Sequence, residues 1–401
     1  MKKIKILRII ARLNIGGPAI HTILLTEGLD KTKFDSLLIC GSVSGDEADM
    51  SYYATDKNIK PYFIPELKRD LDFFKDIAAF KKIYSFIRAE QPDIIHTHTA
   101  KAGALGRLAA IIYNFVNRNK RIKIIHTFHG TIFEGYFNRF KTRLFILAEQ
   151  FLALFTSKII TVSESLKEQL ISLGIGNKDK IGVIPLGFEL EKFLGISPRR
   201  NGVVNIGIIA RLAAIKNHRL FLEAAWRVIC DNPATQLKFK VIGDGELRRE
   251  LEEYARQLNI NTRVDFLGWQ KDLVDVYSNL DVVALTSLSE GTPVSLIEAM
   301  ASARPVVATD VGGVKDLLGR EAGLGVEPGA NFKVLERGIL VGPADSRSFA
   351  AALSFTLRQD KVRRDMAFSG REFAKERFSK ERLLNDIENL YDTLVAPGKS
   401  S

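Results

Sequence analysis

Short apolar runs recur along the chain, and each is followed by a longer segment in which apolar residues return every three or four positions. In the first half, the apolar runs occupy 3–10, 34–40, 94–96, 123–128 and 159–162. In the second half, they occupy 203–210, 236–242, 264–267, 282–286 and 305–309. Such runs are typical of buried parallel strands, and the period between them is typical of helices. The pattern therefore predicts an α/β fold built on parallel sheets.

The length of the chain predicts two domains. The 401 residues exceed the usual size of one domain, and the 46% that are hydrophobic can fill large cores. Residues 190–202 combine glycine, proline and basic residues before a new strand, as is typical of a linker. We therefore expect a first domain at 1–190, a second at 203–375, and a helical end at 376–401.

A loop rich in Ser, Gly, Thr and Pro joins the strand at 282–286 to a helix at 294–302. Such a loop presents unpaired backbone N–H groups and the positive end of the helix dipole, which favour phosphate. Pro293 suits the first helical position, because the N–H that proline lacks would be unpaired there. Glu290 precedes the helix and Glu298 lies inside it, with only ~7 to 9 Å of helix between them. One nucleotide sugar could therefore reach both carboxylates, its sugar hydroxyls donating to Glu290 and its ribose hydroxyls to Glu298.

Basic residues and glycines that could bind a ligand follow several other predicted strands. Arg211 and Lys216 flank a loop that opens a helix, an arrangement suited to a diphosphate, although two solvated cations would give the same pattern. Gly16 and Gly17 follow the first strand, and Gly243 follows a strand of the second half. Glycines at these places let the backbone approach a ligand closely.

Four of the six histidines lie at two strand ends, namely His96, His98, His126 and His129. Because imidazoles ligate metals, a zinc site is one interpretation. The other is a polar lining at the carboxyl ends of parallel strands, where open α/β sheets bind ligands. No Cys, Asp or Glu joins the histidines at ligand spacing, so we expect no metal site and no cofactor.

The net charge of +11 is unevenly distributed. Residues 1–200 hold 31 Lys and Arg against 20 Asp and Glu, whereas residues 201–401 hold 27 of each. The imbalance is strongest at 101–160, with 10 basic residues against 2 acidic ones. A basic first half favours an anionic partner such as membrane headgroups or a phosphorylated acceptor. We expect no nucleic-acid partner, because no nucleic-acid motif accompanies the charge.

Residues 137–158 mix Arg and Lys with Phe and Leu at helical spacing. A basic amphipathic helix can lie on a membrane surface, and the alternative is a core helix with a solvated basic end. No apolar run approaches the length of a membrane span. Cys40 and Cys230 lie in apolar contexts, which predicts buried thiols in a reducing compartment. We expect a cytoplasmic location, with peripheral contact at the inner face of the cytoplasmic membrane as an option.

Several of these motifs resemble glycosyltransferase family 4. Its signature is a pair of glutamates within an E-G-x-P-x-x-x-x-E-A-M-A frame, which is present here from Glu290 to Ala301. The loop with Arg211 and Lys216 is similar to the R-L-x-x-x-K element of that family. The sequence HTFHG, which ends in His129 and Gly130, resembles the family position whose histidine lies against the donor sugar.

The resemblance implies a role for each of these residues. Arg211 and Lys216 would clamp the donor diphosphate, while His129 would orient the donor sugar at the reacting centre and Glu290 would bind it. The other residues expected to bind the donor are Gly16, Gly17, Gly243, Gly291, Thr292, Pro293, Val294 and Glu298. His96 and Lys101 would lie on the acceptor side.

The resemblance also implies the fold and the reaction. The fold would be GT-B, with two doubly wound Rossmann-like domains facing a central cleft and a C-terminal helix that crosses back to the first domain. The first domain would bind the acceptor and the second the nucleotide sugar. The enzyme would be a retaining glycosyltransferase that needs no obligatory metal, because Arg211, Lys216 and the helix start stabilise the leaving diphosphate.

The expected donor is a UDP-sugar, and the expected acceptor is a saccharide or a polyprenyl-diphosphate-linked saccharide in cell-surface polysaccharide synthesis. Three other classes fit the same motifs. One is a nucleotide-sugar epimerase of the same fold, and another is a phosphorylase or synthase with a soluble acceptor. The third is a binding module without turnover, against which the complete set of Arg211, Lys216, Glu290 and Glu298 argues.

Overall fold

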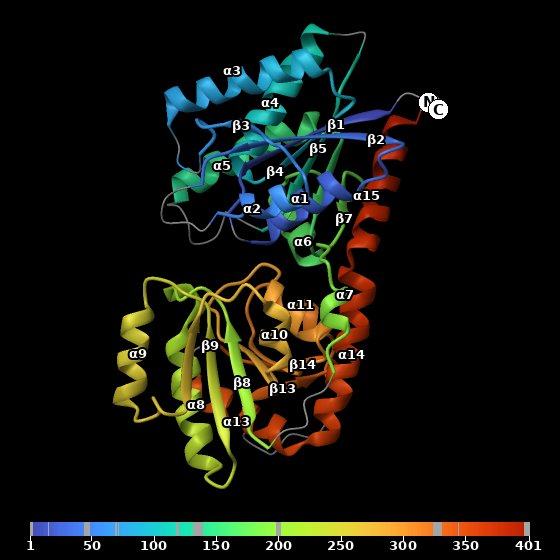
Figure 1. Ribbon diagram of the computed structural model, residues 1–401. Helices are drawn as coiled ribbons and strands as arrows, with labels where there is room; N and C mark the ends of the chain where they lie inside the picture. Colours follow the sequence, from blue (N-terminus) through green and yellow to red (C-terminus); the bar gives the residue numbers. More distant parts are fainter. Residues whose placement is uncertain are drawn as a thin grey trace. The chain divides into compact units, whose positions relative to one another are not determined.

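The computed structural model describes residues 3–14, 16–43, 49–68, 70, 72–117, 120–130, 139–197, 202–323, 331–343 and 345–396. The chain divides into two compact units (Figure 1). The first unit comprises Met1–Phe188 together with Lys380–Ser401, and the second comprises Glu189–Ser379. All described residues of the expected linker at 190–202 therefore belong to the second unit, where they include the short helix α7 (Glu191–Leu194).

The first unit is built on a seven-stranded sheet in the order β3-β2-β1-β4-β5-β6-β7, all of whose strand pairs are parallel. Its strands are β1 (Ile4–Arg12), β2 (Phe34–Gly41), β3 (Tyr62–Ile64), β4 (Ile94–His98), β5 (Lys123–Phe128), β6 (Lys158–Thr161) and β7 (Ile181–Val183). Its helices are α1 (Gly17–Gly28), α2 (Ser51–Asp56), α3 (Phe73–Glu90), α4 (Ala100–Val116), α5 (Arg139–Phe155), α6 (Glu164–Ser172) and α15 (Lys380–Val395).

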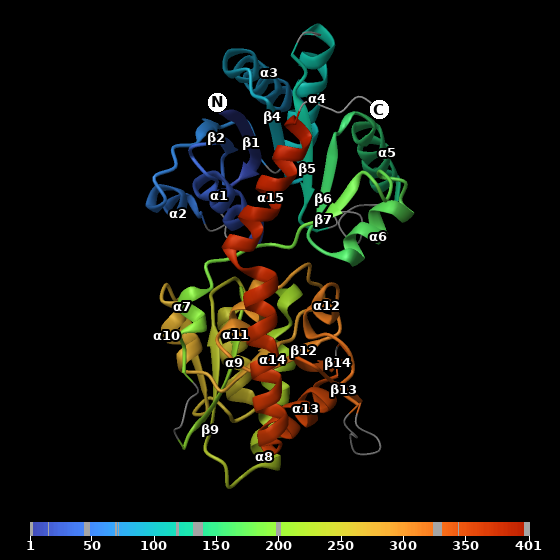
Figure 2. The same cartoon turned by 90° about the vertical axis from the view of Figure 1, so that its right-hand side faces the viewer.

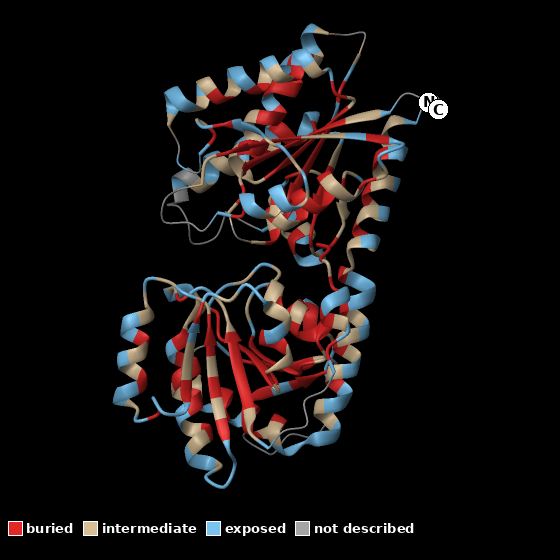
Figure 3. Ribbon diagram, in the orientation of Figure 1, coloured by how far each residue is buried: buried red, intermediate tan, exposed pale blue. Residues whose placement is uncertain are grey.

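Alternate residues of β1 serve the two faces of this sheet, as the two-residue period of a strand requires. Leu7 and Ile9 join a core with α3 and α4, whereas Ile6 joins a core with α1 and α15. Figure 3 shows that the strands are mostly buried, in agreement with their continuous apolar sequence. Covering both faces of a parallel sheet with helices is the arrangement that the apolar runs predict.

The last helix, α15, packs on the first unit although it follows the second unit in sequence (Figure 2). Its Leu383, Ile387 and Tyr391 are fully buried beside the sheet residues Ile94 and Ile125. This return of the chain is the one that the family resemblance implied.

The second unit holds another seven-stranded sheet, in the order β10-β9-β8-β11-β12-β14-β13. Its strands are β8 (Val204–Ile209), β9 (Leu237–Ile242), β10 (Val264–Gly268), β11 (Val282–Leu285), β12 (Val306–Thr309), β13 (Phe332–Leu335) and β14 (Gly338–Val341). Its remaining helices are η1 (Ala214–Lys216), α8 (His218–Asp231), α9 (Arg248–Gln257), α10 (Leu273–Ser278), α11 (Val294–Ala301), α12 (Val314–Leu318), α13 (Ser346–Arg358) and α14 (Asp360–Phe378).

The structure adds to the sequence-based expectations and corrects one of them. The antiparallel β13–β14 hairpin and the short helix α2 were not predicted. Lys333 interrupts the apolar run of β13, and the six residues of α2 are too few to show a helical period. Cys40 is buried as expected, but Cys230 is exposed on α8, so only one of the two thiols is sequestered. Among the described residues, no helix is both long and apolar enough to cross a bilayer.

Candidate functional site

Four of the predicted site residues follow or end the strands between which each sheet reverses its strand order. In the first unit this point lies between β1 and β4, and in the second between β8 and β11. Open α/β sheets bind ligands in the crevice outside the carboxyl ends of the strands at such a point. Gly16 follows β1 and His98 ends β4, while Arg211 follows β8 and Glu290 follows β11. The topology thus gives each unit its own candidate binding edge.

Glu290 forms the centre of the polar cluster in the second unit. Its Oε1 accepts hydrogen bonds from Lys216 Nζ and from Ser287 Oγ, each at 2.6 Å. The Glu290 side chain is 10% exposed and that of Lys216 is 25% exposed, so solvent screens this ion pair only in part. A lysine ammonium has three N–H donors, so Lys216 can bind Glu290 and still donate to a phosphate oxygen.

The loop that carries Glu290 is fixed by its neighbours on both sides. Thr286 Oγ1 donates to the carbonyl oxygen of Lys216 at 3.0 Å, and Leu288 N donates to that of Ile215 at 2.8 Å. On the other side, Gly313 N donates to the carbonyl oxygen of Gly291 at 3.1 Å. A Cβ at Gly312, where φ is +50°, would lie 1.8 Å from the carbonyl oxygen of Glu290. The Glu290 carboxylate is therefore held in place before any ligand arrives.

Helix α11 begins directly after this loop. Pro293 is its N-cap and Val294 its first residue, so proline lies one position earlier than the sequence predicted. The first N–H groups of a helix have no acceptor within the helix, and the helix dipole favours an anion there. Gly291 is exposed and Thr292 is half-buried, which leaves the start of the helix open to a ligand.

Glu298 lies within α11 in a different environment. The Tyr277 hydroxyl lies 3.0 Å from Glu298 Oε2 and also 3.0 Å from the carbonyl oxygen of Ser295. Burial raises the pKa of Glu298 to about 7, although the bond from Tyr277 and the charge of Lys192 act in the opposite direction. This carboxyl group therefore holds its proton to a higher pH than an ordinary glutamate, and it can accept a hydrogen bond from a ribose hydroxyl or, when protonated, donate one.

Arg211 lies apart from the Glu290 cluster. Its side chain is 56% exposed and pairs with Glu246 at 3.2 Å. In the described part of the chain, no hydrogen bond or ion pair connects Arg211 to Lys216 or Glu290. An exposed ion pair stabilises a protein by only ~0 to 1 kcal/mol, so the guanidinium can exchange Glu246 for a diphosphate at little cost.

Gly243 supports the loop that carries Arg211. Its φ is +129°, and a Cβ there would lie 2.0 Å from the carbonyl oxygen of Ala210. Gly243 N donates to the carbonyl oxygen of Gly268 at 2.9 Å. The glycine is therefore required by the close contact between the ends of β8 and β9, whether or not it also touches a nucleotide.

Three histidines meet at the binding edge of the first unit. Nδ1 of His98 and Nε2 of His129 are 3.1 Å apart. The ring of His21, from α1, lies with its centroid 5.6 Å from that of His98 and 5.0 Å from that of His129. Burial lowers the pKa of His21 and His98 well below the ordinary value and that of His129 to about 3. All three imidazoles are therefore neutral at neutral pH.

Several nitrogen atoms of this triad have no hydrogen-bond partner among the described residues. They are both ring nitrogens of His21, Nε2 of His98 and Nδ1 of His129. A buried polar atom without a partner is unfavourable by about 1 to 3 kcal/mol, which favours a ligand that supplies the missing bonds. One nitrogen from each ring lies within 4.8 Å of the others, so these neutral imidazoles are the described residues best placed to hold a metal ion.

Gly16 and Gly17 begin the helix that carries His21. Gly16 is the N-cap of α1, and Gly17 is its buried first residue. His21 therefore lies about one turn beyond the glycine pair. The glycine loop and the histidine triad thus belong to the same edge of the first sheet.

Two residues that were predicted to contact the acceptor, His96 and Lys101, instead contact other side chains and carbonyl groups of the first unit. His96 is fully buried, with Nδ1 2.6 Å from the Tyr391 hydroxyl and Nε2 2.7 Å from Thr127 Oγ1. Lys101 forms an ion pair with Asp76 and donates to the carbonyl oxygen of Asp70. His96 connects α15 to the sheet, and Lys101 connects α4 to α3. The expected contact of either side chain with an acceptor therefore has no support in this geometry.

Two further residues at this edge, His21 and Thr99, were not predicted from the sequence. His21 has no motif of its own, and its distance of one helical turn from Gly17 is the only signal that could have identified it. Thr99, the N-cap of α4, has φ +65° and ψ 155°, which is unfavourable by about 1 to 3 kcal/mol for a β-branched residue. Its Oγ1 accepts a hydrogen bond from Ala11 N at 3.3 Å, directly beside His98. Strain of this kind clusters at functional sites.

Comparisons with known proteins agree with this geometry. The family model described as Glycosyltransferase Family 4 matches residues 15–192, and that described as Glycosyl transferases group 1 matches residues 203–359. The UDP-Gal:alpha-D-GlcNAc-diphosphoundecaprenol alpha-1,3-galactosyltransferase of Escherichia coli is 30% identical over 383 residues, which cover 92% of each chain. The capsular polysaccharide biosynthesis glycosyltransferase CapM of Staphylococcus aureus is 26% identical over 88% of this chain and 89% of its own.

A solved structure gives the corresponding result for the fold. HepE of Anabaena, crystallised in complex with UDP, superposes with a TM-score of 0.76 at 20% identity, covering 97% of this chain and 100% of its own. The relatives found are glycosyltransferases, so the comparisons support sugar transfer and lend no support to the epimerase alternative. The chain therefore belongs to the family 4 glycosyltransferases, and it is a glycosyltransferase with the two-domain GT-B fold.

Proposed function

We propose that this enzyme transfers a sugar from a UDP-sugar to a polyprenyl-diphosphate-linked saccharide during cell-surface polysaccharide synthesis, with retention at the anomeric carbon. The observation that carries the proposal is the Lys216–Glu290–Ser287 cluster beside the start of α11. It combines a cation and a helix N-terminus, which suit a diphosphate, with a fixed carboxylate, which suits sugar hydroxyls. The Escherichia coli relative is named for a UDP-sugar donor and a diphosphoundecaprenol acceptor, which makes UDP-galactose the first donor to test.

In this reaction the bond between the anomeric carbon and the diphosphate oxygen breaks, and its electron pair stays on UDP. The acceptor hydroxyl oxygen forms the new glycosidic bond, and its proton passes to the leaving diphosphate. Negative charge thus develops on the diphosphate, where Lys216, Arg211 and the helix start stabilise it electrostatically. Glu290 binds the hydroxyls of the donor sugar, His129 orients that sugar, and Glu298 binds the ribose.

We further propose that no metal is obligatory, because protein cations and the helix start supply the positive charge that a metal would otherwise supply. A lipid-linked acceptor would place the reaction at the inner face of the cytoplasmic membrane, and the basic first half of the chain fits peripheral contact there. A thermal-shift screen of UDP, GDP and ADP, with and without EDTA, tests the donor and the metal together. A shift with UDP alone that EDTA leaves unchanged supports the proposal, whereas loss of that shift in EDTA would contradict metal independence.

The transfer step is tested with Glu290→Ala and Glu298→Ala. We expect Glu290→Ala to lower transfer from UDP-galactose to an undecaprenyl-diphosphate saccharide by about 100-fold or more, while calorimetric binding of UDP persists. Glu298→Ala should mainly weaken UDP binding. Glu250→Ala, at an exposed surface pair with Arg219, is the matched control and should change neither. Reversed effects of the two variants would refute the assignments, and conversion of the UDP-sugar without transfer would indicate an epimerase.

A further inference from the structure

Helix α5 exposes large hydrocarbon side chains on its outer face, while its inner face buries Leu152, Ala153 and one charged residue. Its exposed large apolar residues are Phe140, Leu144, Leu147, Phe151, Leu154 and Phe155, with Phe140 and Leu154 each 72% exposed. By contrast, Glu149 is buried. A surface helix of a globular protein has the opposite polarity, with its apolar stripe toward the core. The outer face of α5 is therefore built for contact with something apolar.

The exposed residues of α5 form one continuous stripe. Phe140, Leu144, Leu147, Phe151 and Leu154 follow the period of 3.6 residues, so they fall within an arc of about 100°. Arg143 is the only exposed polar residue among the α5 side chains that the structure describes, and it lies at the edge of this arc. Scattered apolar residues on a surface are ordinary, but a contiguous patch marks an interaction site.

The neighbouring helix α4 extends the stripe. All four of its exposed residues are apolar, namely Leu108, Ile112, Phe115 and Val116. The rings of Phe115 and Phe155 lie with centroids 6.0 Å apart, and those of Phe151 and Phe155 lie 5.3 Å apart. These residues of α4 and α5 together form one surface, which we call the α4–α5 apolar face.

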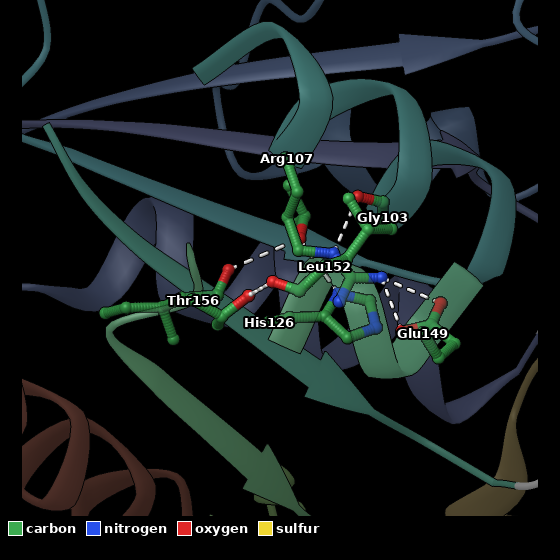
Figure 4. Close-up of polar contacts among 8 residues, drawn as sticks. Gly103, Arg107, His126, Glu149, Leu152 and Thr156 are labelled. Carbon is green, nitrogen blue, oxygen red and sulfur yellow. Dashed lines mark hydrogen bonds and ion pairs between the residues drawn. The ribbon is translucent and has the colours of Figure 1, made fainter. Parts of the chain in front are cut away.

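A buried ion pair fixes the orientation of the two helices. Arg107 Nη2, on α4, donates to both carboxylate oxygens of Glu149, on α5, at 2.7 Å each, and Arg107 Nε donates to the carbonyl oxygen of Gly103 at 2.9 Å (Figure 4). If α5 rotated to bury its apolar stripe, Glu149 would leave Arg107 as an unpaired buried charge, which is strongly unfavourable. The exposure of the stripe is therefore part of the packing of the first unit.

The charge around the α4–α5 apolar face favours an anionic partner. Exposed Arg121 lines a pocket together with Phe115 and Phe155, and exposed Arg143 borders the stripe. No exposed acidic residue occurs among the described side chains of α4 and α5. Pairing of this face with itself in a second copy would bring like charges together without acids to compensate them. An apolar surface with a basic border instead matches the interface of a bilayer with anionic headgroups.

We propose that the α4–α5 apolar face inserts into the interface of an anionic lipid bilayer and holds the first unit at the membrane. The purpose of this contact rests on the proposed function, because a polyprenyl-linked acceptor lies in that membrane. The geometry of the face itself is independent of the reaction. Leu147 and Leu154 would enter the acyl boundary, while Arg121 and Arg143 would contact headgroup phosphates.

The experiment is co-sedimentation of the full chain with vesicles of phosphatidylcholine, with and without phosphatidylglycerol. The test variant is Leu147→Glu/Leu154→Glu, and the control is Phe368→Glu, which changes a side chain of similar exposure (69%) on α14 of the second unit. We expect wild type and control to bind vesicles with phosphatidylglycerol, and the double variant to bind about tenfold or more weakly. The UDP thermal shift of all three proteins should be the same, which shows that they are folded.

Each other result overturns a defined part of the proposal. Equal vesicle binding by the double variant and wild type would exclude the α4–α5 apolar face as the contact. If the wild-type protein bound equally well to vesicles with and without phosphatidylglycerol, Arg121 and Arg143 would not contribute by contacting anionic headgroups. A wild-type dimer in sedimentation velocity that the double variant converts to a monomer would assign the face to a second copy. Vesicle binding without any UDP shift would refute the proposed function and leave the membrane face intact.

Discussion

Glu290 and Glu298 belong to one motif, but their surroundings give them different chemistry. Glu290 accepts hydrogen bonds from Lys216 and Ser287 in a cluster that solvent reaches only in part. Glu298 lies against Tyr277, and burial raises its pKa to about 7. Paired with a cation, Glu290 suits the binding of neutral sugar hydroxyls beside a diphosphate. Glu298, whose pKa burial raises more than Tyr277 and the charge of Lys192 lower it, changes its protonation state near neutral pH.

The raised pKa of Glu298 predicts a pH-dependent stability. In the folded protein this carboxyl group binds its proton up to about pH 7, whereas in the unfolded chain it ionises near its ordinary value of 4.5. Its contribution to the free energy of unfolding is therefore largest below pH 4.5 and is lost as the pH rises to 7. We expect Glu298→Gln to remove this loss, so that its stability relative to wild type increases by about 2 to 3 kcal/mol between pH 5 and pH 8.

Urea unfolding of both proteins at the two pH values measures this difference. Glu250→Gln serves as the control, because Glu250 lies in an exposed pair. Parallel pH profiles of wild type and Glu298→Gln would show that the carboxyl group of Glu298 ionises normally in the folded protein.

At the scale of elements, the loop after β11 depends on the loop after β12. Gly312 and Gly313 approach the carbonyl oxygens of Glu290 and Gly291 so closely that no side chain fits between them. The two strands are neighbours in the sheet, so their carboxyl ends meet at one edge. The position of the Glu290 carboxylate is thus set partly by glycines that lie after the next strand.

We expect Gly312→Ala to impair both stability and transfer. Its Cβ would meet the Glu290 carbonyl oxygen at 1.8 Å, and its φ of +50° is unfavourable for alanine. The free energy of unfolding should fall by about 2 kcal/mol or more, and transfer should fall even at temperatures where the variant is folded. Gly342→Ala is the matched control, because a Cβ there meets nothing within 4 Å. If the two variants had the same stability in urea and the same transfer activity, the loop after β11 would not depend on the glycines after β12.

At the scale of the whole molecule, the chain forms most of the first unit, then the second, and then returns to the first. α15 fills the core of the first unit with Leu383, Ile387 and Tyr391. Tyr391 also binds His96 Nδ1, within the strand that ends in His98 of the histidine triad. The end of the chain thus supports the candidate site of the first unit.

Because α15 packs on the first unit, a substitution in α15 should destabilise that unit and not the second. Ile387→Ala removes a fully buried side chain and should destabilise the first unit by about 2 to 5 kcal/mol. Hydrogen exchange followed by mass spectrometry should show faster exchange in peptides from β4 and β5, with little change in those from β11 and β12. Asn389→Ala, on the exposed side of α15, is the control and should change neither group. Faster exchange only in peptides of the second unit would contradict the assignment of α15 to the first unit.

The local features of this protein could be predicted from its amino-acid sequence alone. Periodicity identified most of the strands and helices, and the family frame around Glu290 and Glu298 predicted the fold, the family and the enzyme class, all of which are confirmed. These predictions were possible because the apolar period of an element and the spacing of the motif from Glu290 to Ala301 both involve residues that are close together in the sequence. Strand β13 was missed although it is as long as β11 and β12, because Lys333 interrupts the continuous apolar run that identified those two strands.

Which distant side chains meet became known from the three-dimensional structure. In the structure, Lys216 contacts Glu290, and His21, His98 and His129 come together from three different parts of the chain. His96 and Lys101 instead make contacts that hold elements of the first unit together. The structure also placed one apolar face of α5 on the outside, a choice that the amphipathic pattern left open. Such contacts depend on the order of the strands in each sheet and on which helix covers each face of that sheet. Those features follow from long-range packing, and a local pattern does not contain them.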